Sequence, residues 1–207
     1  MLTRHSTFHA IHRIDFEPDS FTAADLLWLP HHAQLANSGK KRQTEHLAGR
    51  IAAVHALRAF AEKSVPSIGH QRQPVWPAGL HGSISHCGHT AVAIVARAPV
   101  GIDIETLFSP ALADALANDI AREDELAVLR GGELPFPLAL TLAFSAKESL
   151  YKALSARHPT LLHFHDAVVK GLSASTITLS LPALAQSASL RWYAVSPQHI
   201  ITCFSQK

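Results

Sequence analysis

Two periods of hydrophobic and polar positions run along this chain, one typical of helices and one typical of strands. The first strong helical pattern covers residues 40–62. Its apolar positions recur every three or four residues, as on one face of a helix: Leu47, Ile51, Val54, Leu57 and Ala61. Residues 111–129 and 137–155 also have a helical pattern, and a shorter helix capped by Thr22 is expected within residues 16–29.

Short apolar runs predict strands in the middle and at the end of the chain. In the middle they cover residues 82–85, 90–96 and 100–105, and the close spacing of the last two suggests an antiparallel pair. Near the end, the predicted strands are residues 166–170, 175–181, 190–195 and 199–204. The order of helix, strands, helices and strands favours an α+β fold with antiparallel sheets over a doubly wound parallel sheet.

Composition places the chain among globular proteins. Of its 207 residues, 47% are apolar and 16% are charged, which allows a core and excludes disorder as the main state. No apolar run reaches the ~18–20 residues that span a bilayer, and no N-terminal stretch has signal-peptide length, so we expect a cytoplasmic protein without a membrane span. The net charge of +2 is too small for a general nucleic-acid binder. The two cysteines, Cys87 and Cys203, fit a reducing compartment.

The segment Gly101-Ile102-Asp103-Ile104-Glu105 contains the first candidate for chemistry. Side chains alternate along a strand, so the two isoleucines can enter the core while Asp103 and Glu105 share the outward face, ~7 Å apart. Two carboxylates on one face repel unless a cation lies between them, and oxygen ligands suit Mg²⁺. Taken alone, an ordinary half-exposed strand with its acidic residues outward explains the pattern equally well.

The second candidate is the helical run Phe144-Ser145-Ala146-Lys147-Glu148-Ser149-Leu150-Tyr151-Lys152. Glu148 and Lys152 are four residues apart and meet on one helix face, whereas Lys147 lies about 100° around the helix. For this pair alone, a surface ion pair worth only about a few tenths of a kcal/mol is the simpler interpretation.

The third candidate is residues 81–89, which are rich in glycine, serine and histidine. Gly82 and Gly88 let a backbone approach a ligand closely, and serine and histidine can donate to phosphate oxygens. A zinc site is the rival interpretation, although its spacing matches no familiar zinc pattern. Its ligands would be His81, His86, Cys87 and His89. The basic run Lys40-Lys41-Arg42, followed by Arg50, is by itself typical of a solvated helix face.

The order and spacing of these segments are specific when they are taken together. In chain order the set is Gly49-Arg50, Pro74-Val75-Trp76-Pro77, Gly82-Ser83-Ile84-Ser85-His86, Gly101-Ile102-Asp103-Ile104-Glu105, and Phe144 to Lys152. This set resembles the 4′-phosphopantetheinyl transferases of the surfactin type and, within them, the enterobactin branch. The resemblance covers residues ~40–155, with five motifs in register.

The resemblance implies two similar α/β halves that form a pseudo-dimer. Residues 1–99 would hold the nucleotide contacts and the Ser-His motif, and residues 100–207 would hold the metal carboxylates and the Lys-Glu helix. Asp103, Glu105 and Glu148 match the family's Mg²⁺ ligands, and Glu148 is also the candidate general base. Ile104, between the carboxylates, cannot bind metal, so water must fill that position.

Coenzyme A would be bound by basic and polar residues that match the family motifs. Arg50 would bind the nucleotide end, His86 would contact phosphate, and Lys152 would reach the phosphates and take part in catalysis. The implied coenzyme A-binding set is Arg42, Arg50, Arg72, Ser85, His86, Lys147 and Lys152.

The implied reaction moves 4′-phosphopantetheine from coenzyme A to a serine of an apo carrier protein, which can be a peptidyl, aryl or acyl carrier. Adenosine 3′,5′-bisphosphate is the other product, and siderophore or other secondary-metabolite biosynthesis is the expected context for a monomeric enzyme. Two alternatives stay open. One is a non-catalytic module that binds coenzyme A or a carrier, and the other is a zinc-dependent hydrolase built on residues 81–89.

Overall fold

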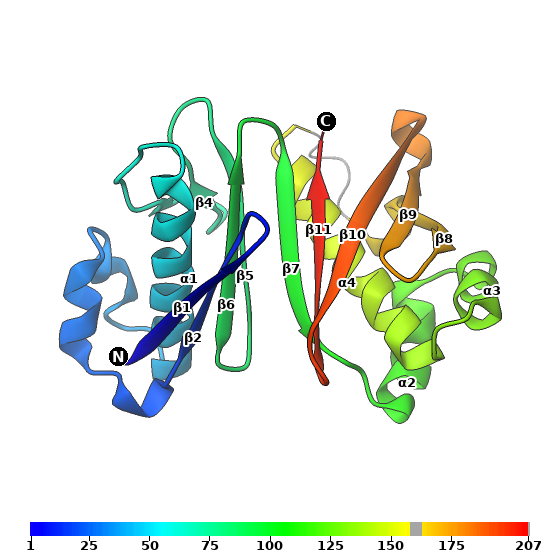
Figure 1. Cartoon of the computed structure of the whole chain (residues 1–207), viewed down its shortest axis with the longest axis horizontal. Coiled ribbons are helices and arrows are strands. Elements are labelled where there is room, and N and C mark those ends of the chain that lie inside the picture. The colour runs from blue at the N-terminus through cyan, green and yellow to red at the C-terminus, as the bar shows by residue number, and fades with distance from the viewer. Residues whose placement is uncertain (158–162, 207) are drawn as a thin grey trace. The chain divides into compact units, whose positions relative to one another are not determined.

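The chain forms two compact units, Met1–Pro99 and Val100–Lys207, hereafter the N-terminal and C-terminal units. The computed structural model describes residues 1–157 and 163–206 (Figure 1). Each unit contains an antiparallel sheet on which a 19-residue helix packs. The predicted α+β class with antiparallel sheets is therefore confirmed.

The sheet of the N-terminal unit has the strand order β1-β2-β6-β5. Its strands are β1 (Thr3–Phe8), β2 (Ile11–Phe16), β5 (His81–Cys87) and β6 (Thr90–Ala96), each antiparallel to its neighbour. Helix α1 (Lys40–Arg58) packs on β2, β5 and β6. Alanines on both surfaces let the helix approach the sheet closely, because they add little bulk to this core.

Short elements complete the N-terminal unit. They are the 3₁₀ helices η1 (Pro18–Ser20), η2 (Ala23–Trp28) and η3 (His32–Leu35), and the strands β3 (Ser67–Ile68) and β4 (Pro74–Val75). Thr22 precedes η2 as expected, and its backbone N–H donates to Asp25 Oδ2 at 2.7 Å. The helix expected within residues 16–29 is thus two short 3₁₀ helices.

The sheet of the C-terminal unit has the strand order β7-β11-β10-β9-β8. Its strands are β7 (Val100–Thr106), β8 (Val168–Leu172), β9 (Thr176–Leu181), β10 (Gln186–Ser196) and β11 (His199–Ser205). Helix α4 (Phe136–Leu154) packs on β7 and β11, while α2 (Pro110–Ile120) and α3 (Glu123–Gly131) pack against α4. The 3₁₀ helices η4 (Phe164–Asp166) and η5 (Pro182–Leu184) flank β8 and β9.

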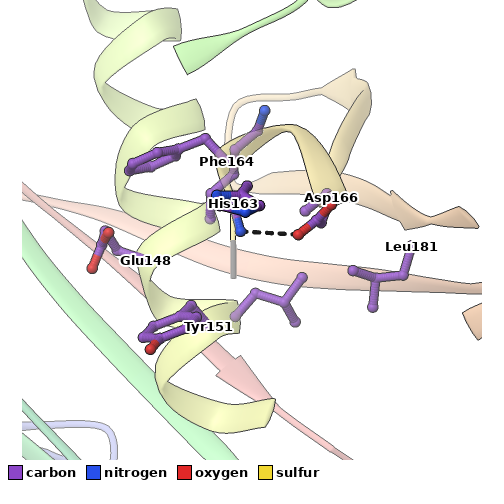
Figure 2. Close-up of a pocket in the computed structure, with 9 residues that line it drawn as sticks. Glu148, Tyr151, His163, Phe164, Asp166 and Leu181 are labelled. Atoms are coloured by element: carbon purple, nitrogen blue, oxygen red, sulfur yellow. Dashed lines mark hydrogen bonds between the residues drawn. The ribbon is translucent and has the colours of Figure 1, made fainter. Parts of the chain in front are cut away.

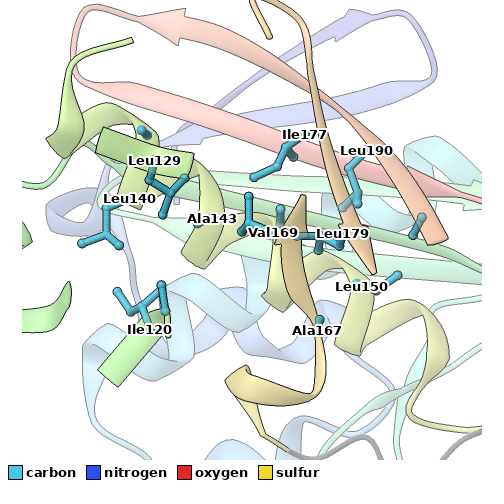
Figure 3. Packing of buried hydrophobic residues seen from close by; sticks show 14 of the residues in the cluster. Ile120, Leu129, Leu140, Ala143, Leu150, Ala167, Val169, Ile177, Leu179 and Leu190 are labelled. Carbon is cyan, nitrogen blue, oxygen red and sulfur yellow. The ribbon is translucent and has the colours of Figure 1, made fainter. Parts of the chain in front are cut away.

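The core of the C-terminal unit lies between its sheet and its helices (Figure 3). The helices contribute Leu129, Leu140 and Leu150, and the strands contribute Val169, Ile177, Leu179 and Leu190. All of these side chains are almost completely enclosed, and a buried leucine or isoleucine stabilises a fold by about 1.5–3 kcal/mol. This core fixes α4, the helix that carries the Lys-Glu motif.

Two expectations from the sequence are wrong in detail. Residues 90–96 and 100–105 do not pair with one another, because β6 lies between β2 and β5 while β7 pairs with β11 in the other sheet. Residues 111–129 form two helices, because the backbone is extended at Ala121 and Arg122. The Glu125 carboxylate accepts the Arg122 N–H at 3.0 Å and so caps the second helix.

Candidate active site

Helix α4 lies unusually close to β7 and β11. A Cβ atom added to Gly101 would overlap the carbonyl oxygen of Ser149, so only glycine fits at this point of the strand. The Ser149 hydroxyl of α4 donates to the carbonyl of Thr202 on the neighbouring strand, β11, at 3.0 Å. The Ser145 and Thr202 hydroxyls lie 2.9 Å apart. These contacts fix the position of the helix over this edge of the sheet.

The face of β7 that carries Gly101 also carries Asp103 and Glu105, so the expected alternation places both carboxylates toward α4. The Lys152 ammonium of α4 donates to Asp103 Oδ1 at 2.6 Å and to the Ile102 carbonyl at 3.4 Å. Asp103 is only 2% exposed and Glu105 is half-buried, so the expectation of an outward, solvent-facing pair is wrong. The helix covers the face on which the carboxylates lie.

The acidic residues and Lys152 influence one another electrostatically. Burial and the charges of Asp103 and Glu148, opposed by Lys152, raise the pKa of Glu105 to about 7. Burial also raises the pKa of Glu148, with Asp103 adding to the effect and Lys152 opposing it. Three carboxylates from β7 and α4 therefore lie within electrostatic reach of each other, with a single sign of charge that favours a cation.

The donor set suits Mg²⁺ better than it suits zinc. Mg²⁺ prefers carboxylate oxygens and is typically completed by water and substrate phosphates, not by an all-protein cage. Over residues 1–157 and 163–206, no group of three or more His, Cys, Asp or Glu side chains is placed to hold a metal ion, and this applies to Asp103, Glu105 and Glu148 as well as to residues 81–89. That finding gives no support to the zinc interpretation of residues 81–89.

A pocket opens beside Glu148 in the C-terminal unit (Figure 2). Helix α4 provides Glu148 and Tyr151, and the opposite wall comes from the segment around η4, where the His163 N–H donates to Asp166 Oδ2 at 2.9 Å. The full lining is Lys147, Glu148, Leu150, Tyr151, His163, Phe164, Asp166, Ala167 and Leu181. The pocket therefore combines apolar walls with a carboxylate at its edge.

The wall around η4 was missed by the sequence analysis, because it lies outside the recognised motifs. A signal for it was present in the aromatic residue of the Lys-Glu motif. Phe144 stacks on Phe164 with ring centroids 5.2 Å apart and contacts Phe108 at 5.8 Å. Phe144 thus joins α4 to the pocket wall.

Lys147 has a different environment from the one that the motif suggested. Its ammonium is 2.7 Å from Glu125 Oε1 and donates to the Ile120 carbonyl at 2.8 Å, and the residue is only 4% exposed. Burial lowers the pKa of Lys147, while the hydrogen bond to Glu125 opposes that shift. Lys147 therefore has protein partners in the place of the expected coenzyme A phosphate.

In the N-terminal unit, Arg50 is also buried. Its Nε donates to the Pro66 carbonyl at 2.7 Å and a terminal nitrogen donates to the Ser67 carbonyl at 3.3 Å. Burial lowers the pKa of Arg50 to about 10, with nearby Arg42 adding to the effect. Arg50 holds the start of β3 against α1, a role that its place in the first motif did not reveal.

The remaining basic candidates surround His46 on α1. Burial, together with the charges of Arg50, His31, Arg42 and His86, lowers the pKa of His46 to about 3. Arg42 and Arg50 of α1 and the distant His86 of β5 are therefore brought near one another around a histidine that stays neutral.

Three other placements complete the expected set. Ser85 is buried in β5, next to His86, whose Nδ1 lies 3.7 Å from Glu45 Oε1. Arg72 is exposed in the turn between β3 and β4, where its φ of 64° is left-handed. No contact described for Arg72 links it to the group around His46.

Comparison with known families agrees with this arrangement. Residues 31–96 match the 4′-phosphopantetheinyl transferase N-terminal domain, and residues 99–203 match the 4′-phosphopantetheinyl transferase superfamily. The chain therefore belongs to the 4′-phosphopantetheinyl transferases, as its motifs indicated.

Similar curated proteins refine this placement. Enterobactin synthase component D of Salmonella typhi is 54% identical over 190 residues, which cover 89% of this chain and 81% of that protein. Its counterpart in Salmonella typhimurium is 53% identical over 196 residues, covering 92% and 83%. The 4′-phosphopantetheinyl transferase PptT of Mycobacterium tuberculosis is 34% identical over 150 residues, covering 67% and 63%. The predicted similarity to the enterobactin branch is confirmed.

Among residues 1–157 and 163–206, no helix is long and apolar enough to cross a bilayer.

Proposed function

We propose that this chain transfers the 4′-phosphopantetheine group of coenzyme A to a serine of an apo carrier protein, in a reaction that needs Mg²⁺. One observation supports the proposal most directly. Asp103, Glu105 and Glu148 lie within electrostatic reach of one another, with the Lys152 ammonium against Asp103. This combination suits a substrate that brings both phosphate charge and a proton to be removed.

The two carboxylates of β7, with Glu148, would hold Mg²⁺. When bound, Mg²⁺ supplies positive charge that neutralises the pyrophosphate of coenzyme A. Lys152, which is only partly buried, can exchange its contact with Asp103 for one with a substrate phosphate. Its ammonium would then stabilise charge that develops on the phosphoryl oxygens.

Glu148 is the proposed general base. Its carboxylate lies at the edge of the pocket and within electrostatic reach of Lys152, so it can accept a proton from a serine that approaches the substrate phosphates. The serine oxygen would attack the β-phosphorus of coenzyme A while its proton passes to Glu148, directly or through water. The bond from that phosphorus to the bridging oxygen breaks, and adenosine 3′,5′-bisphosphate leaves with the electron pair.

The pocket beside Glu148 is proposed to receive the pantetheine arm. That arm is the part of coenzyme A without phosphate charge, and the pocket offers Leu150, Tyr151, Phe164 and Leu181 as apolar contacts. Glu148 lies at the edge of this pocket, so an arm bound there leaves its phosphate end near the acidic group (Figure 2).

The cations of the N-terminal unit are proposed to bind the nucleotide phosphates. Arg42 and His86 retain exposed surface near the buried Arg50, and Ser85 lies next to His86 in the same strand. Arg72 stays in this set only through the family motif. Lys147 is left out, because Glu125 and the Ile120 carbonyl enclose its ammonium.

The partners follow from the reaction. Apo carrier domains of the peptidyl, aryl or acyl type are the proposed acceptors, and the enterobactin synthase relatives favour a carrier of siderophore biosynthesis. We propose a monomer that acts in the cytoplasm, where coenzyme A and the synthetases that contain carriers are found.

Mass spectrometry of an apo carrier tests the proposal. After incubation with purified protein, coenzyme A and Mg²⁺, the carrier should gain the mass of one phosphopantetheine. The carrier with its serine replaced by alanine should gain nothing, and EDTA should stop the reaction with the normal carrier. If coenzyme A binds but no tested apo carrier gains mass, the chain is a non-catalytic binding module.

A further inference from the structure

A buried ion pair adjoins the proposed general base without being part of it. Lys147 Nζ lies 2.7 Å from Glu125 Oε1, and both side chains are almost completely enclosed. Breaking such a pair on one side strongly destabilises a protein, because it leaves a charge buried without a partner. A pair of this kind beside a reactive group needs an explanation beyond general stability.

The Glu125 carboxylate connects several elements. Its Oε2 accepts the N–H of Arg122, at the start of α3, at 3.0 Å, and its Oε1 accepts the N–H of Val169 in β8 at 2.8 Å. The Lys147 ammonium of α4 forms an ion pair with the Glu125 carboxylate, and the same ammonium donates to the Ile120 carbonyl at the end of α2. One carboxylate and one ammonium thus join α2, α3, α4 and β8.

The side of α4 that Lys147 holds determines how Glu148 is oriented. Successive residues of a helix are about 100° apart, so Lys147 fixes one side of α4 while Glu148 projects from the next. Ser145 and Ser149 fix a further side through Thr202 of β11. Glu148 therefore projects between two anchored sides of the helix, and its direction depends on both.

The connection also reaches the pocket. Val169 follows Ala167 by two residues, and Ala167 lines the pocket together with Glu148. The Glu125 carboxylate thus links the wall that ends at Ala167 to the helix that forms the opposite wall. A shift of α4 relative to β8 would change the width of the pocket as well as the position of the base.

We propose that Lys147 and Glu125 form an internal strut that positions Glu148 and the pocket walls, and that Lys147 promotes the reaction through this strut and not by contacting coenzyme A. The inference rests on the proposed transferase function. It assigns Lys147 and Glu125 as positioning residues and gives a role to an acidic residue that lies outside the family motifs identified in the sequence.

The test compares Lys147→Met, Glu125→Gln and the double variant. Steady-state kinetics should be measured well below each melting temperature, so that unfolded protein does not contribute. Each single variant should lower kcat by roughly 10–100-fold, because small misplacements of a reacting group are costly. KM for coenzyme A should rise by less than about tenfold and by a similar factor in both variants, because the pocket for the uncharged arm is disturbed while the phosphate contacts remain. The double variant should lose no more kcat than the worse single variant, because both changes remove the same strut.

Stability should show the same coupling. Each single change should lower the melting temperature by roughly 6–12 °C, and the double change should lower it by less than the sum. The matched control is Lys170→Met with Asp124→Asn. This exposed pair joins two of the four elements, β8 and α3, at 3.8 Å, and its removal should leave kcat and the melting temperature near those of the unchanged protein.

A direct phosphate contact predicts a different pattern. Lys147→Met would then raise KM for coenzyme A by roughly 10–150-fold, Glu125→Gln would be near normal, and the effects would multiply in the double variant. That result would overturn the strut. If Lys147→Met does not fold, the isosteric variant Glu125→Gln tests the strut by itself. A normal kcat in Glu125→Gln would also overturn the proposal. If the protein without substitutions modifies no carrier, the proposed transferase function is wrong, and the strut is not what has failed.

Discussion

Helices α1 and α4 are both 19 residues long and each packs on an antiparallel sheet, yet the two units use them for opposite charges. On α1, the polar residues that face inward include His46 and Arg50, and Arg42 lies one turn away. On α4, Glu148 meets the carboxylates of β7. Similar scaffolds thus offer cations in one unit, suited to phosphate, and carboxylates in the other, suited to a metal and a proton.

The two helices also differ in the kind of contact that they make with their sheets. Between α1 and its sheet the contacts are mostly alanines, which make no demand on direction. Between α4 and its sheet, the glycine at 101 and the hydroxyls of Ser145, Ser149 and Thr202 form directional contacts. Directional contacts specify a position more narrowly than apolar ones, as the proposed site of phosphoryl transfer requires.

Glu148→Gln should have the largest effect on activity. If it had none, the acidic role assigned to α4 in the comparison would be wrong. The change removes a proton acceptor and a metal charge together, so kcat should fall by roughly 10³-fold or more. Thermal stability should stay level or rise slightly, because the raised pKa shows that burial disfavours this carboxylate. Carrier mass shift under saturating coenzyme A measures the first effect and thermal melting the second. The exposed Glu133→Gln is the control, and a normal kcat in Glu148→Gln would refute the assigned base.

Gly101→Ala should have the next largest effect and tests the directional packing of α4. The new methyl group must displace the Ser149 carbonyl and with it the helix. We expect kcat to fall by roughly 10²-fold and the melting temperature to drop. Gly171→Ala in β8 is the matched control, because a Cβ atom at that glycine meets nothing within 4 Å. Equal behaviour of the two variants would mean that the close approach is unimportant.

Arg50→Ala should have a smaller effect on activity and tests the cations of the N-terminal unit. Arg50 is buried and adds positive charge beside the exposed Arg42, so its loss should raise KM for coenzyme A by roughly tenfold, with little change in KM for the carrier. Some stability should also be lost, because the Pro66 and Ser67 carbonyls lose their donor. Dephospho-coenzyme A and the exposed Arg58→Ala serve as controls. An equal KM increase with both nucleotides would limit Arg50 to holding β3.

Acidification should produce the smallest effect, with opposite signs in the two units. His46 has a folded pKa of about 3 against an ordinary 6.5, so the stability it contributes is present above pH 6.5 and is lost as pH falls below that value, by about 2 kcal/mol at pH 5. Glu105 has a folded pKa of about 7 against an ordinary 4.5, so its contribution to stability grows as pH falls from 7 toward 4.5.

Melting curves at pH 5 and pH 8 in EDTA would measure this difference. His46→Gln should lose less stability on acidification than the unchanged protein, and Glu105→Gln should gain less. In melting temperature each difference should be a few degrees, since about 1 kcal/mol corresponds to ~2–4 °C at this chain length. Parallel pH dependence in all three proteins would contradict both assignments.

The sequence predicted much of the fold because periodicity reports burial. The strand at Thr90–Ala96 was predicted with its exact limits, and α4 and β7 were predicted to within one residue at each end. Strand β1 was missed because it is almost wholly exposed and its residues are mostly polar. Strand β2 was missed because its apolar residues, Ile11, Ile14 and Phe16, do not alternate strictly with polar ones. Strand partners could not be read from spacing, since β6 had two other neighbours available.

The candidate site was predicted as a set of residues, without their surroundings. Residue types and spacing indicated Asp103, Glu105 and Glu148, and those side chains do come within electrostatic reach. Spacing could not show that Lys147 faces inward, because its partner Glu125 lies 22 positions away on another helix. Burial of Arg50 was equally hidden, since the carbonyls that it meets belong to Pro66, in an irregular loop, and to Ser67, at the start of the two-residue strand β3.

The contact between Lys152 and Asp103 bears on the order in which this protein matures. Without a metal, the ammonium supplies a positive charge to the buried carboxylate, so the chain can fold before any cation arrives. Under the proposed function, folding and metal binding would be separate events, unlike in small domains that fold only around their ion. Substrate and metal would then meet a chain that is already folded, and their binding would free the lysine to contact phosphate.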